Sequence, residues 1–260
     1  MKTFLVPLLG IPEDRGTLLN AIEVARIAGG HVTALLPEHG IEVARKVFEE
    51  VARERALAET QAPVSPGHVE VTLESLEVEA QGGTMEATLR GSAIYQDALL
   101  LAHSISDTNE PLQRNALEWA LNAGRPVIVL PASLPQPFGS RIAIAWNATL
   151  EAAHAVTAAL PWLHRAASVH VLTAAMSGIQ ASSADDLRRY LAWHHIDATT
   201  RTCDPGSGFA GTAILKMARD VSANMLVAGA YSHARMREVL LGGVTRQLLS
   251  EARVPVLFSR

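Results

Sequence analysis

The sequence predicts an α/β protein made of two tandem domains, each an open parallel sheet covered by helices on both faces. Three observations carry this prediction. Apolar, β-branched and leucine-rich runs alternate with helical patterns, the order of these segments repeats along the chain, and a proline-rich stretch separates the two copies. Uninterrupted apolar runs of this kind are typical of strands buried on both faces of a parallel sheet.

Each half opens with the same strand, helix and strand. The first strands are short apolar runs that end in a small residue. They cover Phe4 to Gly10 and Ile142 to Ala148. The helical patterns that follow are Thr17 to Ala28, closed by Gly29-Gly30, and Leu150 to Arg165, and the second strands are His31 to Leu36 and Ser168 to Thr173.

The later elements also recur in both halves. In the first half only, Ile41 to Ala58 has apolar residues spaced among charges, which favours a helix packed on the sheet over a partner-binding helix. Gln61 to Gly67 has two prolines and is expected to be a loop. The two further pairs of strands are Asp97 to Ala102 with Asn224 to Gly229, and Arg125 to Leu130 with Arg253 to Phe258.

A linker is expected at Leu130 to Gly139, which holds three prolines and shows no periodicity. The predicted domains are therefore residues 1–134 and 140–260. A chain of 260 residues with 48% hydrophobic content is long enough for two ordinary cores.

Charge and cysteine content exclude several classes of function. With 18% charged residues and a net charge of −4, no basic patch is available for nucleic acid or an anionic membrane. The lone Cys203 forms no intrachain disulfide and fits a reducing compartment. No apolar run approaches the roughly 18 residues of a membrane-spanning helix, so we expect a soluble cytoplasmic protein.

One loop of the second half has residues suited to binding an anionic ligand. Gly229 directly follows a buried-strand pattern, and Gly242-Gly243 directly precedes a helical one. Glycine lets the backbone approach a ligand, and amides at a helix start favour an anion such as phosphate. Thr245 adds a hydroxyl donor. The alternative is that these glycines only build a tight turn from strand to helix.

The spacing Gly229-x2-Ser232-x9-Gly242-Gly243 resembles the loop of the universal stress protein family. The resemblance extends over the whole chain as a tandem pair of adenine-nucleotide α-hydrolase-like, Rossmann-like domains. It implies that ATP or another adenine nucleotide binds there. The residues expected to hold ribose and phosphate are Gly229, Ser232, Gly242, Gly243, Val244 and Thr245.

The same resemblance implies further features of the site and the assembly. Asn147 stands where the family usually has an adenine-contacting aspartate, and Ala145 lies beside it. The closing strand of this family often pairs across a dimer interface, which implies a homodimer or an intrachain pseudo-dimer. No acidic pair is evident for magnesium, so any Mg²⁺ would be held by the phosphates themselves.

Two departures from the family pattern lie in the loop, and the first half lacks the loop altogether. Ser232 replaces a glycine, and Gly243 replaces a hydroxyl residue that donates to phosphate. The first half has no glycine from Ser92 to Ala123 and carries Asp107 and Glu110 where an anion would lie. Leu9 occupies its aspartate position. We expect this half to be structural or to serve as an interaction surface.

The sequence therefore predicts a nucleotide-binding stress-response regulator with little or no catalysis and no catalytic or metal-binding residues. A nucleotide-free interaction protein is the alternative. A third reading, an enzyme of the related α-hydrolase type, lacks a clear phosphate loop after either first strand. The adjacent His194-His195 is not expected to share a metal, because neighbours on a helix point in different directions. Trp162 and Trp193 fall in helical patterns and are expected in the core.

Overall fold

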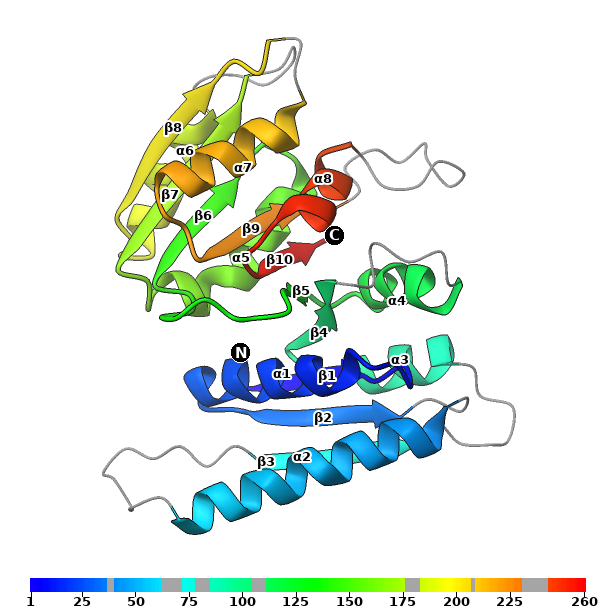
Figure 1. Ribbon diagram of the computed structural model, residues 1–260. Coiled ribbons are helices and arrows are strands. Elements are labelled where there is room, and N and C mark those ends of the chain that lie inside the picture. Colours follow the sequence, from blue (N-terminus) through cyan, green and yellow to red (C-terminus); the bar gives the residue numbers. More distant parts are fainter. Residues whose placement is uncertain are drawn as a thin grey trace. The chain divides into compact units, whose positions relative to one another are not determined.

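The computed structural model describes residues 1–36, 40–61, 72–77, 85–103, 111–175, 183–206, 209–230 and 243–260. Its contacts divide the chain into two compact units, Met1–Ser133 and Leu134–Arg260. We call them the N-terminal and C-terminal units (Figure 1).

The N-terminal unit is an open parallel sheet with strand order β3-β2-β1-β4-β5. Crossovers between parallel strands are right-handed, which puts α1 with α2 on one face and α3 with α4 on the other. Both helix pairs are in contact. The elements are β1 (Thr3–Pro7), α1 (Asp14–Ala28), β2 (His31–Leu36), α2 (Ile41–Gln61), β3 (Thr72–Glu77), α3 (Met85–Ala93), β4 (Ala98–Ala102), α4 (Pro111–Asn122) and β5 (Val127–Leu130).

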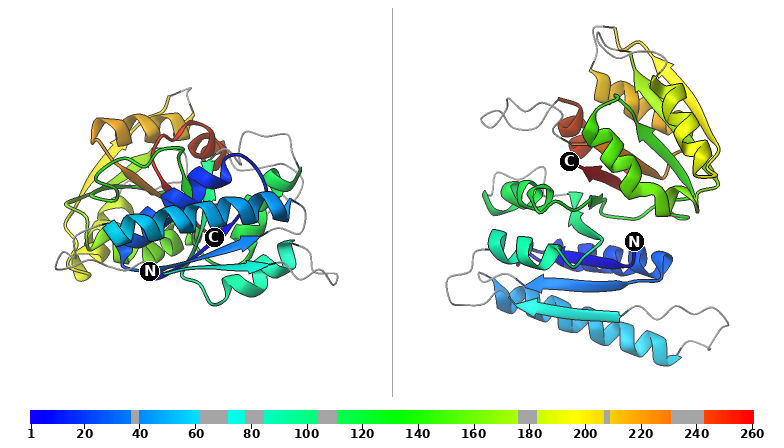
Figure 2. Two further views of the ribbon diagram at one scale, coloured as in Figure 1. Left: turned by 60° about the horizontal axis from the view of Figure 1, so that its bottom comes forward. Right: turned by 180° about the vertical axis from the view of Figure 1, so that it is seen from behind.

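The C-terminal unit repeats this order as β8-β7-β6-β9-β10, again with all strands parallel. Figure 2, seen from behind, shows α5 and α6 on the face of its sheet opposite to α7 and α8. The elements are β6 (Arg141–Ala145), α5 (Leu150–Leu163), β7 (Ser168–Ala174), α6 (Ser183–Trp193), β8 (Ala198–Cys203), α7 (Ala210–Asp220), β9 (Met225–Gly229), α8 (Gly243–Glu251) and β10 (Val256–Ser259).

The first loops of the two units share two backbone features. After β1 the amide of Leu8 donates to the carbonyl of Leu35 over 2.9 Å, and after β6 the amide of Trp146 donates to that of Leu172 over 2.9 Å. Two residues later, Gly10 has a φ of 74° and Ala148 a φ of 57°. Since left-handed backbone favours glycine, Ala148 retains this turn at a cost in strain.

The fourth strand of each unit is fixed to the first by one polar side chain. Asp97 accepts from the amides of Lys2 and Thr3 in the N-terminal unit. Asn224, which is 4% exposed, accepts from the amide of Arg141 over 2.9 Å and donates to the oxygens of Pro137 and Ser140. The repeat seen in the sequence therefore extends to matching hydrogen bonds.

The predicted fold class, α/β with open parallel sheets, is confirmed. Several boundaries differ: α1 begins at Asp14 instead of Thr17, α2 continues through Gln61, and Leu130 belongs to β5 and not to the linker. Trp162 is 3% exposed as expected, but the prediction for Trp193 is wrong because it is 85% exposed at the end of α6. Among the described residues, no helix is long and apolar enough to cross a membrane.

Candidate functional site

The strand order of the C-terminal unit reverses between β6 and β9. From β6 the chain adds β7 and β8 on one side, and it then crosses to place β9 on the other. Ala145, the last residue of β6, pairs with Ala228, so Gly229 ends β9 at the same edge. Ligands of open parallel sheets bind at this kind of edge, outside the carboxyl ends of the strands.

The loop after β6 is ordered by its own polar side chains. Asn147 accepts, through Oδ1, a hydrogen bond from the Thr149 hydroxyl over 2.9 Å. The Thr149 hydroxyl in turn accepts from the amide of Ala152 over 3.3 Å and caps α5. Asn147 is half-buried, and its side-chain amide donates to none of the described residues. It therefore presents a donor at the edge of the sheet.

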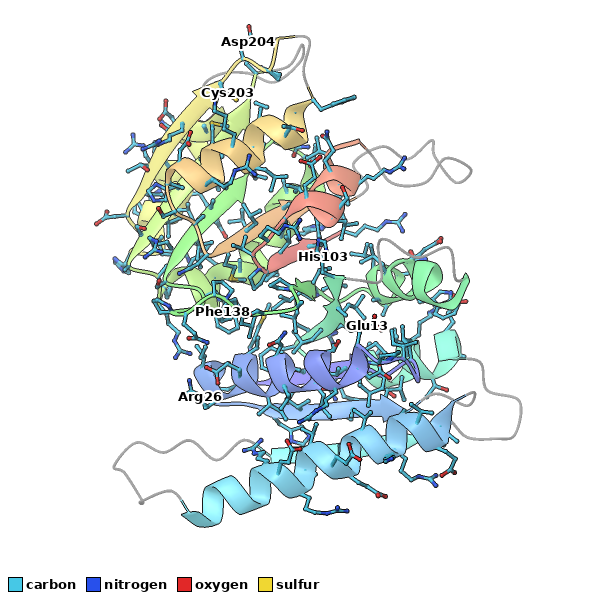
Figure 3. All side chains as sticks on the ribbon, in the orientation of Figure 1. Glu13, Arg26, His103, Phe138, Cys203 and Asp204 are labelled. Carbon is cyan, nitrogen blue, oxygen red and sulfur yellow. The ribbon has the colours of Figure 1, made fainter. Side chains whose placement is uncertain are left out.

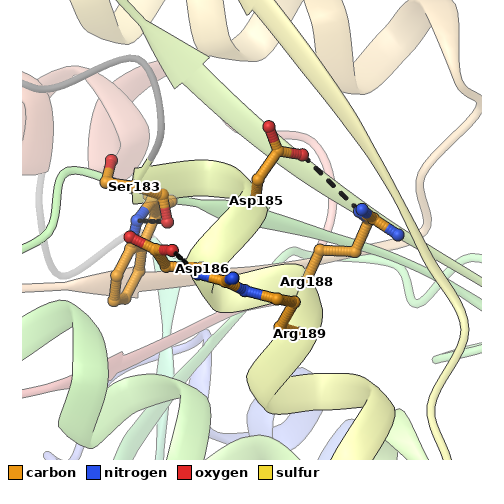
Figure 4. Close-up of polar contacts among 6 residues, drawn as sticks. Ser183, Asp185, Asp186, Arg188 and Arg189 are labelled. Atoms are coloured by element: carbon orange, nitrogen blue, oxygen red, sulfur yellow. Dashed lines mark hydrogen bonds and ion pairs between the residues drawn. The ribbon is translucent and has the colours of Figure 1, made fainter.

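Trp146 connects this loop to the start of α6. Its indole Nε1 donates to the carbonyl of Ser183 over 3.1 Å, and Figure 4 shows Ser183 beside the surface ion pairs of α6. Those pairs join Asp185 to Arg188 and Asp186 to Arg189. Within the described parts of the chain, the buried hydroxyl of Ser183 has no hydrogen-bond partner.

Gly229 lies against the first turn of α5. A Cβ at this position would be 2.5 Å from the amide nitrogen of Ala152 and 2.8 Å from the carbonyl carbon of Glu151. Its φ is not left-handed, so space and not backbone conformation requires glycine here. The structure thus gives Gly229 a packing reason that does not depend on a ligand.

The start of α8 has space around it among the residues that the structure describes. Gly243 is exposed, and a Cβ there would meet nothing within 4 Å. No described residue accepts from the amides of Gly243, Val244 or Thr245. Thr245 is only 6% exposed, so its side chain lies on the inner face of the helix. Free amides in the first turn carry the positive end of the helix dipole.

The predicted site residues fall into three groups. Ala145, Asn147 and Gly229 meet where the strand order reverses. The second group, Gly243, Val244 and Thr245, opens α8. Ser232 and Gly242 lie outside the described residues.

In the N-terminal unit the corresponding loop is filled by a carboxylate of the chain itself. Asp14 is 3% exposed and accepts from the amides of Leu9, Gly10 and Ile11 over 3.0, 2.7 and 3.1 Å. Burial raises the pKa of this carboxyl, and the three amides oppose that rise. Sequence reasoning missed Asp14, although an acidic residue four positions after a loop glycine was a visible signal.

The C-terminal unit has no counterpart to this carboxylate. Matching the two first loops aligns Asp14 with Ala152, a 2% exposed residue whose side chain accepts no hydrogen bond. The amides of Asn147, Ala148 and Thr149 donate to none of the described residues. A carboxylate thus accepts from the loop amides in one unit, and no described residue does so in the other. The predicted acidic loop with Asp107 and Glu110 lies outside the described residues.

Other candidates are less well placed. Cys203 and Asp204 lie together at the end of β8 (Figure 3), where burial raises the pKa of the thiol and the Asp204 charge adds to the effect. Asp204 accepts from the amide of Gly206 over 2.8 Å, in a turn with left-handed Gly206. Among the described residues, no cluster of three metal-ligating side chains is present.

Comparisons with known proteins show which structures and which family the chain resembles. A search of curated proteins finds no match. A universal stress protein from Archaeoglobus fulgidus has a similar structure, with a TM-score of 0.70 and 14% identity over 99% of this chain and 98% of that one. A functionally unknown protein from Pseudomonas aeruginosa gives a TM-score of 0.63 and 17% identity over 100% and 92%.

The cytoplasmic domain of a prokaryotic cation chloride cotransporter gives a TM-score of 0.53 and 15% identity over 99% of this chain and 94% of that domain. At these identities the three likenesses establish the fold alone. The model of the universal stress protein family matches residues 97–260, in one continuous stretch that does not itself mark two copies. Because that stretch is more than half of the chain, the protein described here belongs to the universal stress protein family.

Proposed function

We propose that the C-terminal unit binds one adenine nucleotide, ATP, ADP or AMP, as the regulatory ligand of a stress-response protein. The observation that carries this proposal is the edge of the sheet at β6 and β9, where the strand order reverses and the two predicted loops emerge. One loop offers the donor of Asn147, and the other leads to α8, whose first amides donate to no residue that the structure describes. An anion at such a helix start is stabilised by the dipole.

Each group of residues has a part in this proposal. The amides of Gly243, Val244 and Thr245 would receive a phosphate, and Arg246 on the exposed side of α8 would add positive charge. Asn147 would meet the base, and Ala145 would leave room beside it. Gly229 would act indirectly, because its lack of a side chain lets β9 and α5 approach.

We propose binding rather than turnover for this site. The described residues 145–152, 229–230 and 243–246 include one carboxylate, Glu151, and no histidine. Phosphoryl transfer needs a positioned base or water together with metal-coordinating groups. A bound nucleotide would instead change the conformation or the partner affinity of the protein.

Titration calorimetry of purified protein with ATP tests the proposal. We expect about one nucleotide per chain, and we expect Gly242→Asp to abolish binding by placing a negative charge beside the phosphates. Gly91→Asp is the matched control, since Gly91 is exposed in α3 of the other unit and a Cβ there meets nothing within 4 Å. Absence of heat at millimolar ATP would refute the proposal.

An interaction protein without a nucleotide is the second candidate. Leu150 and Phe209 are 75% and 73% exposed, and they follow β6 and β8 at the same edge of the sheet. An exposed apolar side chain at such an edge can contribute to a binding surface for another protein. A chain that binds no ATP but loses a partner on Leu150→Ser with Phe209→Ser would fit this reading.

A further inference from the structure

The outer strand of the C-terminal sheet has exposed side chains on both faces. β8 ends the strand order and pairs only with β7 among the described strands. Its four central residues, Thr199 to Thr202, are all exposed, although successive side chains point to opposite faces. A β8 residue shares a face with its β7 partner, and those partners are largely buried. The helices therefore leave the central side chains of the last strand exposed.

The backbone of β8 presents hydrogen-bonding groups outward. The carbonyl of Cys203 accepts from Ala175, so the groups of Cys203 and of every second residue before it point toward β7. Ala198, Thr200 and Thr202 then point their amide and carbonyl groups away from the sheet. An exposed edge of this kind, rich in threonine and without proline, is a template for another strand.

Two unpaired charges give this edge a preferred partner. Asp197 immediately precedes β8 and Arg201 lies within it, both exposed and spaced four residues apart on one face. Neither forms an ion pair or a side-chain hydrogen bond with any residue that the structure describes. An antiparallel copy of this segment brings opposite charges face to face at both ends of the contact.

We propose that β8 is a self-association edge that pairs antiparallel with β8 of a second copy of this chain. The pairing centres on Thr199, which lies opposite its own copy. Ala198 then faces Thr200 of the partner subunit, and Asp197 faces Arg201 of the partner subunit. In two symmetric copies, equivalent residues lie on the same face of the joined sheet. Residues that are directly opposite each other in a strand pair also lie on the same face. The sequence separation between paired positions must therefore be even.

Charge selects among the registers that meet this condition. A pairing centred on Arg201 places two guanidinium groups directly opposite each other, which is destabilising. In a pairing centred on Thr200, Arg201 is diagonal to Asp197 of the partner subunit and not directly opposite it. The pairing centred on Thr199 makes two direct ion pairs across the two strands. It also continues the outward hydrogen bonds of Ala198 and Thr200 in both copies.

Disulfide trapping tests the register, and the single native cysteine simplifies it. Thr199→Cys with Cys203→Ser should form a covalent dimer under mild oxidation. Opposite residues that are not hydrogen-bonded have Cα atoms about 4.5 Å apart, within the reach of a disulfide. Wild type is the control: two Cys203 thiols in this pairing would be eight residues apart, about 27 Å. Equal trapping of the two proteins would overturn the proposal.

Charge reversal tests the same contact in the unmodified chain. Arg201→Glu or Asp197→Lys alone should raise the dimer dissociation constant about tenfold, since each dimer contains two such pairs. The double variant should return it to near the wild-type value. Sedimentation equilibrium at several protein concentrations measures these constants without nucleotide, so the outcome is independent of ATP binding. Single variants that dimerise as wild type does would refute the contact.

Discussion

The packing of Gly229 against α5 gives a quantitative prediction for Gly229→Ala. The added methyl group would be 2.5 Å from the amide nitrogen of Ala152, 2.8 Å from the carbonyl carbon of Glu151 and 3.0 Å from the Cα of Ala152. All three atoms belong to the backbone of a capped helix, so no flexible side chain can turn away. Overpacking of this kind costs roughly 1–3 kcal/mol, and we expect the upper half of that range.

Thermal and urea denaturation without nucleotide measure this cost. For a unit of this size, about 2–3 kcal/mol corresponds to a fall in Tm of roughly 5–15 °C. Gly243→Ala is the matched control, because Gly243 belongs to the same predicted loop but a Cβ there meets nothing within 4 Å. That variant should lose no stability and could gain up to about 1 kcal/mol from reduced backbone entropy.

The comparison separates two reasons for a glycine. If Gly229→Ala unfolds within about 0.5 kcal/mol of wild type, the packing argument is wrong. A stable variant that lost only ATP affinity would show that the ligand, and not α5, requires the glycine. Loss of both stability and affinity would follow from a displaced α5, because Asn147 and Thr149 are joined to that helix through its cap.

Three further substitutions test the hydrogen bonds and turns that support the site. Ala148→Gly should raise the free energy of unfolding by about 1 kcal/mol, since the φ of 57° strains alanine. An unchanged midpoint in urea denaturation would contradict this prediction. Asp14→Ala should lower the free energy of unfolding by about 2–4 kcal/mol by leaving three amides without an acceptor, and Asp14→Asn, which keeps one acceptor oxygen, should lose less. Gln247→Ala should lower the free energy of unfolding by about 1 kcal/mol, because the Gln247 side chain accepts from the amide of Gly211 over 3.1 Å at the start of α7. Gln247→Glu retains the acceptor and should stay near wild type in the same assay.

The elements could be predicted from the sequence because their signals are local. Apolar runs and helical periodicity identify the strands and helices one segment at a time. The start of α1 was missed because Asp14 resembles a loop residue, and its carboxylate indeed binds the preceding turn and not the helix that it opens. The exposure of Trp193 was missed for a different reason. Periodicity places a residue on a helix, but it does not show where that helix extends beyond the sheet.

The reasons behind individual site residues were harder to predict, since they depend on contacts between distant segments. Gly229 was predicted as a point of ligand approach, and nothing near it in the sequence indicates that α5 lies against it. Thr245 was predicted as a phosphate donor, whereas its side chain is 6% exposed on the inner side of α8. Its amide donates to no residue that the structure describes, so the role that we propose for Thr245 is one of its backbone and not of its hydroxyl.

The first loops of the two units differ in whether a side chain of the protein accepts from their amides. A row of amides after a first strand must find an acceptor, because a buried donor without one is costly. In the N-terminal unit Asp14 supplies that acceptor from within the chain. In the C-terminal unit Ala152 supplies none, and the amides of Asn147, Ala148 and Thr149 donate to none of the described residues. A single side chain, Asp14, thus accounts for the difference between the two first loops, and the glycine pattern differs between the units in a separate loop. Both differences support the proposal that the C-terminal unit binds the nucleotide.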